Sequence, residues 1–236
     1  MQDKPKTRRI GLIDALRGAA VLMMLVHHTL YDLADFGFMP REVFEHPAVS
    51  ALQVTCATTF VLLCGVSSNL SKSNLKRGLI TAGVALGISV VTYIIGMPIL
   101  FGVLHLLAVC MLLYALTEKL LVKLPALPGT LVCALLAVLS KLATERLAVD
   151  THYLWLLGWT YPGFVSYDYF PLFPWLFVFL TGAFAGRLLL SRPLPERVYA
   201  LRCRWLEFIG RHALVIYVVH QPLLFGLFTL LDRVFH

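Results

Sequence analysis

The first long apolar stretch of the chain, residues 10–32, carries ionisable side chains that could do chemistry inside a membrane. Its sequence, IGLIDALRGAAVLMMLVHHTLYD, is long enough to cross a bilayer as a helix. An Asp or Arg near the centre of such a helix costs roughly 2.5 to 3.5 kcal/mol on insertion scales, so these groups are expected to face a protein interior or a wet cavity. Successive residues of a helix are turned by about 100°, so one narrow stripe holds Asp14, Gly18, Val21, Leu25, His28 and Asp32. Arg17 lies about 60° from the centre of this stripe.

Arg17 and His28 lie at two depths of this polar stripe. A rise of about 1.5 Å per residue puts them roughly 16 Å apart along the axis, so they do not touch through their own helix. The structural alternative is that Asp14 and Arg17 form an ion pair one turn apart and that His28 is a hydrogen-bonded core histidine. We favour a functional role for the whole stripe, because a structural helix has little need of so many ionisable groups on one face.

The composition places this helix in a polytopic membrane protein. Apolar residues make up 59% of the chain and charged residues 14%, whereas a soluble domain is about 45 to 50% apolar and about 25% charged. We therefore expect an all-α bundle of about seven transmembrane helices in a single domain over residues 1–236. The expected spans are 10–32, 47–70, 79–95, 99–116, 129–147, 171–190 and 205–231, with an irregular aromatic segment, interfacial or re-entrant, over 150–170.

The positive charges orient this bundle. Lys and Arg outnumber Asp and Glu by 20 to 13. Four of them, Arg41, Lys141, Arg146 and Arg233, fall on the predicted outer side. The predicted cytoplasmic stretches hold Lys4, Lys6, Arg8, Arg9, Lys72, Lys76, Arg77, Lys119, Lys123, Arg187, Arg192, Arg197, Arg202 and Arg204. The positive-inside rule favours an internal N-terminus and an external C-terminus, so the basic balance indicates orientation before nucleic-acid binding.

Further ionisable groups fall inside later spans, namely His105, Arg211, His212 and His220. Imidazole is a general base or proton relay near neutral pH, so these histidines suggest proton transfer. No pair of them shows the ligand spacing of a helical zinc site, and we expect no metal. The residues alone leave two functions open: an enzyme, or a proton-coupled small-molecule transporter that uses the same Asp/Arg/His groups. A non-catalytic membrane scaffold is a third reading.

Four blocks of sequence favour the enzyme by resemblance. They are IDALRGAAVLMMLVHHTLYD, FGVLH, YDYFPLFPW and IGRHALVIYVVHQP. Together and in this order, they resemble the bacterial heparan-alpha-glucosaminide N-acetyltransferase catalytic-domain family, which is similar to the wider transmembrane acyltransferase superfamily. In acyltransferases of that superfamily the first helix carries an Arg followed eleven residues later by a His, and here these are Arg17 and His28. The resemblance implies transfer of an acetyl or other acyl group from cytoplasmic acyl-CoA to a sugar amine or hydroxyl on the far side.

The resemblance also implies a set of catalytic residues. His28, oriented by Asp14 or Asp32, is expected to take the acceptor's proton, and a donor such as Arg17, His105 or His220 is expected to stabilise the oxyanion. In lysosomal relatives the histidine regarded as catalytic lies in the loop before the second span. The nearest candidate here is His46, so the base is expected at His28 first and His46 second.

Binding residues complete the expectation. The phosphates of the donor, acetyl-CoA or another acyl-CoA, are expected at Arg8, Arg9, Lys72, Lys76 and Arg77, whose alternative roles are orientation and anionic lipid. The sugar acceptor is expected near Asp32, Asp168, Tyr169, Trp175, Arg211, His212, Tyr217 and Gln221. For Asp168 and Tyr169 the alternative is an interfacial aromatic belt. The expected partners are acyl-CoA, a saccharide and membrane lipids in the bacterial inner membrane, without nucleic acid, and a homodimer is left open.

Overall fold

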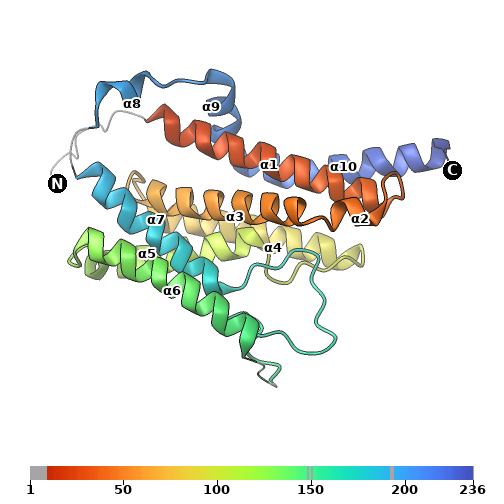
Figure 1. Ribbon diagram of the computed structural model, residues 1–236, viewed down its shortest axis with the longest axis horizontal. Helices are drawn as coiled ribbons and strands as arrows, with labels where there is room; N and C mark the ends of the chain where they lie inside the picture. Colours follow the sequence, from red (N-terminus) through yellow and green to blue (C-terminus); the bar gives the residue numbers. More distant parts are fainter. Residues whose placement is uncertain (1–9, 148, 150, 192–193, 236) are drawn as a thin grey trace. The chain divides into compact units, whose positions relative to one another are not determined.

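The computed structural model describes residues 10–147, 149, 151–191 and 194–235, and these fold mainly into α-helices (Figure 1). The helices are α1 (Gly11–Asp35), α2 (Arg41–Phe44), α3 (Pro47–Ser68), α4 (Asn74–Ile94), α5 (Val103–Leu121), α6 (Ala126–Arg146), α7 (Leu172–Leu190), α8 (Glu196–Ala200), α9 (Arg204–Arg211) and α10 (Ala213–Phe235). Of these described helices, seven are long and apolar enough to cross a membrane: α1, α3, α4, α5, α6, α7 and α10. The predicted all-α polytopic bundle is confirmed, and the chain is a multi-pass membrane protein.

The last predicted span, residues 205–231, is wrong in its extent, because the backbone breaks at His212. Two helices replace the single expected one: the short α9 and the spanning α10. The reason is polarity, since α9 carries Arg204, Glu207 and Arg211 within eight residues, and Glu207 forms ion pairs with Arg202 and Arg211. The apolar α10 alone has the composition of a membrane span.

The described residues divide into two compact units, which we treat separately. The first contains the residues up to Phe60 and those from Leu194 onward, and the second contains the residues from Val61 to 191. Helix α3 begins in the first unit and ends in the second. The expectation of one transmembrane domain over residues 1–236 stays a prediction.

In the first unit, α1 packs against α9 and α10 (Figure 1). The helices α1 and α9 approach each other at two glycines. A Cβ atom built on Gly18 would collide with the carbonyl oxygen of Leu206, and one built on Gly210 would collide with that of Asp14. Only glycine lacks this atom, so the two glycines let the backbones touch. This contact accounts for the glycine in each of the LRG and IGRH motifs.

In the second unit, α4 packs against α5, and α6 packs against α7 (Figure 1). The end of α3 meets α7 through the same device, because a Cβ on Gly65 would collide with the carbonyl oxygen of Phe179. The side chain of Asn69 then ties the two segments together by donating to the carbonyl oxygen of Ala183 at 2.9 Å. Close backbone approach at small residues is the usual way in which membrane helices associate.

The aromatic segment, described over residues 151–170, forms no helix and is held by the turn between α4 and α5. The backbone N–H of Tyr167 donates to the carbonyl of Pro98 at 3.1 Å, and that of Phe170 donates to Phe101 at 2.8 Å. The Ser166 hydroxyl accepts from the N–H of Leu100 at 3.1 Å. The irregular backbone expected here is therefore confirmed, and the N–H groups of Tyr167 and Phe170 are satisfied by protein partners.

Candidate functional site

Two of the predicted catalytic histidines meet in the first unit. His28 comes from α1 and His220 from α10, and their ring centroids are 4.8 Å apart with the planes inclined at 65°. His220 is 7% exposed, so its imidazole is almost fully buried. Two imidazoles in contact on two helices that are long and apolar enough to cross a membrane are the clearest candidate for proton transfer among the described residues.

The tautomer of His220 follows from its hydrogen bond. Its Nδ1 lies 2.6 Å from the carbonyl oxygen of Tyr217, and a carbonyl only accepts, so Nδ1 carries the proton. In the neutral ring the Nε2 atom is then unprotonated and carries a lone pair. Nε2 is buried and has no hydrogen-bond partner within the described ranges. The arrangement presents a basic nitrogen whose opposite side is fixed by the backbone, which is the usual device for orienting a catalytic histidine.

The neighbouring residue, Gln221, carries a second polar contact between α1 and α10. Its Nε2 donates to the two carboxylate oxygens of Asp32 at 3.0 and 3.3 Å, and Asp32 is 1% exposed. The Gln221 Oε1 atom is buried and has no partner in the part of the chain that is described. The carboxylates expected to orient His28 thus have other contacts: Asp32 with Gln221, and Asp14 with Arg17 at 3.0 Å.

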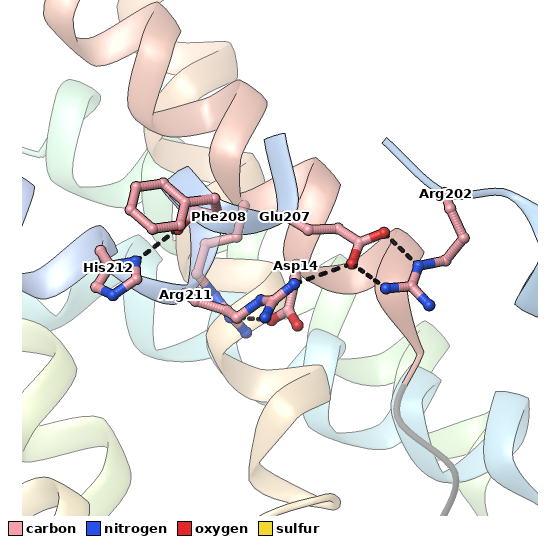
Figure 2. A network of polar contacts seen from close by, with 7 residues as sticks. Asp14, Arg202, Glu207, Phe208, Arg211 and His212 are labelled. Atoms are coloured by element: carbon pink, nitrogen blue, oxygen red, sulfur yellow. Dashed lines mark hydrogen bonds and ion pairs between the residues drawn. The ribbon is translucent and has the colours of Figure 1, made fainter. Parts of the chain in front are cut away.

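A second polar group, the Arg–Glu–Arg cluster of Arg202, Glu207 and Arg211, lies where α9 packs on α1 (Figure 2). The buried Glu207 carboxylate receives two hydrogen bonds from Arg202, Nε to Oε1 at 2.6 Å and Nη2 to Oε2 at 2.7 Å. Arg211 Nη2 donates to the same Oε2 at 3.2 Å. Figure 2 shows Asp14 close to this cluster. Hydrogen bonding by Arg202 lowers the pKa of Glu207, and the same contact raises the pKa of Arg202.

Sequence reasoning did not select Arg202 or Glu207 as site residues. The available signal was Glu207 itself, an acidic residue in a strongly basic region, four residues before Arg211 on one helix. Arg202 precedes the helix, so helical periodicity does not predict its contact with Glu207. That contact depends on how the chain turns into α9. The predicted substrate residue His212 ends this helix, where its Nδ1 lies 2.9 Å from the Phe208 carbonyl.

The depressed pKa of Glu207 predicts a specific loss of stability in acid. A carboxyl whose pKa is lower in the folded state stabilises that state above its ordinary pKa, and the stabilisation is lost as the pH falls through the folded value. We expect the Tm of the wild-type protein to fall more steeply than that of Glu207→Gln as the pH is lowered from about 7 to about 3. Thermal unfolding in detergent measures both curves. Parallel curves for the two proteins would contradict an ionised Glu207 in the folded state.

His105, a predicted oxyanion donor, lies in the second unit and has structural bonds on both nitrogens. Its Nδ1 accepts from the backbone N–H of Gly102 at 3.2 Å, at the start of α5. Its Nε2 is 3.0 Å from the Ser89 hydroxyl, which donates its own proton to the Ile99 carbonyl at 2.6 Å. Nε2 of His105 is therefore the donor in that pair. His105 fastens α5 to α4, and both ring nitrogens are occupied by that task.

Asp168, a predicted acceptor residue, lies at the same helix end. Its Oδ2 accepts from the N–H of Val103 at 3.1 Å, so a carboxylate caps the first turn of α5, where the helix dipole favours negative charge. The neighbouring Tyr169 donates its hydroxyl to the carbonyl of Trp155, and burial raises the pKa of Tyr169 to about 12. Trp175, at the start of α7, packs on Phe170 with ring centroids 5.2 Å apart.

The cap makes a prediction that separates the two roles of Asp168. Asp168→Ala is expected to destabilise the protein by about 1 kcal/mol, because the N–H of Val103 loses its acceptor. Asp168→Asn keeps an oxygen at the same place and is expected to retain both the Tm and the rate of the acyl transfer that the sequence resemblance implies. Thermal unfolding and transfer assays on the two variants decide the matter. An Asp168→Asn protein that is stable and inactive would show that the charge acts on the substrate.

The remaining predicted residues belong to different elements of the two units. His46 is exposed, and its Nδ1 accepts from the N–H of Ala48 at 3.2 Å at the start of α3. Lys72 and Lys76 are exposed near the start of α4, and Arg77 Nη1 is 3.4 Å from Asn74. Arg8 and Arg9 lie outside the described residues. Across residues 10–147, 149, 151–191 and 194–235, no group of three or more His, Cys, Asp or Glu is placed to hold a metal ion.

Comparison with known proteins gives one match. The family model described as "Heparan-alpha-glucosaminide N-acetyltransferase, catalytic" matches residues 9–222, which is most of the chain. Neither the curated proteins nor the solved structures contain a match. The matched range includes the His28 and His220 pair, Asp32, Gln221 and the Arg–Glu–Arg cluster.

Proposed function

The chain belongs to the heparan-alpha-glucosaminide N-acetyltransferase catalytic family and is a transmembrane acetyltransferase, and from this premise we propose its reaction. It transfers an acetyl group, or another acyl group, from acyl-CoA to an amine or hydroxyl of a sugar. The observation that carries the proposal is the contact between His28 and His220 at 4.8 Å, with a free Nε2 on the buried His220 ring. A reaction that moves one proton needs such a base.

In the proposed mechanism His220 is the general base. As the acceptor nitrogen or oxygen attacks the thioester carbonyl, its proton passes to Nε2 of His220, while Nδ1–H stays on the Tyr217 carbonyl. The tetrahedral intermediate then collapses, the C–S bond breaks, and the proton on Nε2 passes to the departing thiolate. The products are the acylated sugar and CoA. This reverses the sequence-based preference for His28 as the base, because His220 has the orienting hydrogen bond.

The oxyanion of the intermediate needs a hydrogen-bond donor, which is typically worth about 3 kcal/mol. Arg17 lies roughly 16 Å from His28 along α1, beyond reach of the same carbonyl. Both nitrogens of His105 are occupied at the start of α5. His220, the third donor expected from the sequence, is the base in this proposal. The donor role therefore goes to His28, which was expected to be the base and is in contact with His220.

The proposed topology puts the N-terminus in the cytoplasm of a bacterium and the C-terminus outside its inner membrane. The support is the distribution of Lys and Arg, most of which fall in the segments predicted to lie on the same side of the membrane as the N-terminus. Acyl-CoA then approaches from the cytoplasm, where basic side chains attract its phosphates, and the sugar approaches from the far side.

The proposal is tested with the purified full chain in detergent. Acetyl-CoA is supplied with glucosamine, release of the CoA thiol is followed by absorbance, and the acetylated sugar is identified by mass spectrometry. We expect thiol release that depends on the acceptor. Absence of both thiol release and acylated product with acetyl-CoA and with longer acyl-CoA donors would refute the proposed reaction.

A further inference from the structure

The Arg–Glu–Arg cluster has more positive charge than its carboxylate neutralises. Arg202 and Arg211 share the one carboxylate of Glu207. These three side chains therefore keep one surplus positive charge. Arg204, which begins α9, is exposed and adds another on the same short segment.

The two guanidinium groups are also close together and accessible. Both contact Oε2 of Glu207, at 2.7 and 3.2 Å, so their Nη2 atoms lie within about 6 Å of each other. The carboxylate beneath them is almost fully buried, with its side chain 2% exposed, whereas the side chains of Arg202 and Arg211 are 54% and 39% exposed. The buried Glu207 carboxylate thus holds the two partly exposed arginines next to each other through its hydrogen bonds.

Part of each guanidinium is left over for a ligand. Arg202 uses Nε and Nη2 on Glu207, and Arg211 uses Nη2. Within the described part of the chain, Nη1 of Arg202 and the Nε and Nη1 of Arg211 make no hydrogen bond. Planar N–H forks that are fixed in position and within one phosphate's reach of each other match the oxygens of a phosphate or pyrophosphate.

We infer that Arg202 and Arg211, positioned by Glu207, form a phosphate-binding site. Two sources offer this chemistry: the phosphates of the CoA donor and the headgroup of an anionic lipid. The CoA source rests on the proposed function. A lipid headgroup fits equally the expected cytoplasmic side of this cluster, where basic residues meet anionic lipids. In both cases the ligand bridges the two guanidiniums.

The test uses the full chain with single substitutions. Arg211→Gln is the main variant, because Arg202 still makes two hydrogen bonds to Glu207 and keeps that carboxylate paired. Arg202→Gln is the second variant, and Arg233→Gln, an exposed arginine near the end of α10, is the control. Each protein is titrated with CoA and with 3′-dephospho-CoA by calorimetry. Each is also reconstituted in nanodiscs of phosphatidylethanolamine with phosphatidylglycerol, and native mass spectrometry counts the retained phosphatidylglycerol.

For a CoA site, we expect Arg211→Gln to weaken CoA binding about tenfold and Arg233→Gln to bind CoA as wild type does. For a lipid site, CoA binding stays the same and Arg211→Gln retains less phosphatidylglycerol. Either result supports the phosphate site and identifies its source. Unchanged CoA binding together with unchanged lipid retention in Arg211→Gln would overturn it.

A further measurement tests phosphate binding independently of enzymatic turnover. Inorganic pyrophosphate is expected to raise the Tm of the wild-type protein and to raise that of Arg211→Gln less, a comparison that needs no turnover. Wild-type protein that binds CoA or lipid through these arginines without releasing acetyl would leave the site standing and refute the proposed reaction. The opposite result is also distinct. If the wild-type protein turns over and Arg211→Gln keeps the wild-type KM, pyrophosphate response and lipid retention, the proposed reaction stands and the phosphate site is refuted.

Discussion

His220→Gln is expected to lower kcat for acetyl transfer by about 10²- to 10⁴-fold, the usual contribution of a positioned general base. Glutamine approximates the size of imidazole and has no basic nitrogen, so proton removal from the acceptor is lost while α1 and α10 stay packed. Thiol release from acetyl-CoA under saturating glucosamine measures kcat directly. His28→Gln is expected to cost about 10²- to 10³-fold, the range for one oxyanion donor.

The control for this pair is His152→Gln, because His152 is an exposed histidine in the aromatic segment and takes no part in the proposed reaction. It should keep the wild-type rate. The Tm of each variant must stay close to that of wild type for the rates to be compared. Loss of activity in His28→Gln with full activity in His220→Gln would return the base to His28. Full activity in both variants would rule out the histidine pair as the site of proton transfer.

Gly210→Ala is expected to disrupt the docking of α9 on α1 and to destabilise the protein by about 3 kcal/mol or more. The added Cβ atom would collide with the backbone carbonyl of Asp14, and a backbone atom cannot rotate away as a flexible side chain can. Overpacking usually costs about 1 to 3 kcal/mol, and contact with main chain belongs at the upper end. The measurement is the free energy of unfolding in mixed micelles, with far-UV circular dichroism as the signal.

Gly226→Ala is the matched control, a glycine-to-alanine change in α10 where the new Cβ atom meets nothing within 4 Å. Alanine is the better helix former by about 1 kcal/mol, so this variant should be as stable as wild type or more so. Gly18→Ala, which meets the Leu206 carbonyl from the other side of the same contact, should resemble Gly210→Ala. Equal stability of Gly210→Ala and Gly226→Ala would mean that α1 and α9 do not touch at these glycines.

The amino-acid sequence by itself determined the class of fold and the grouping of ionisable residues on one face of α1. A run of about 20 apolar residues has one stable form in a bilayer, so length and hydropathy predicted the seven spans. Helical periodicity is a local property, and it placed Asp14, His28 and Asp32 on one face of α1 before any contact was known. The family motifs then indicated acyl transfer, and the family match confirms the family.

Only the tertiary structure decided which polar groups meet. Asp32 and Gln221 are 189 residues apart in the chain, and no periodicity relates the face of one helix to the face of another. The same limit hid the role of Glu207 and the contacts of His105 and Asp168, each of which makes a hydrogen bond with a backbone N–H at the start of α5. The type of a side chain determines which reactions it can support. Its hydrogen-bond partners determine which of its atoms remain available for them. For His220 that partner is the Tyr217 carbonyl, which occupies Nδ1, while Nε2 has no hydrogen-bond partner among the described residues.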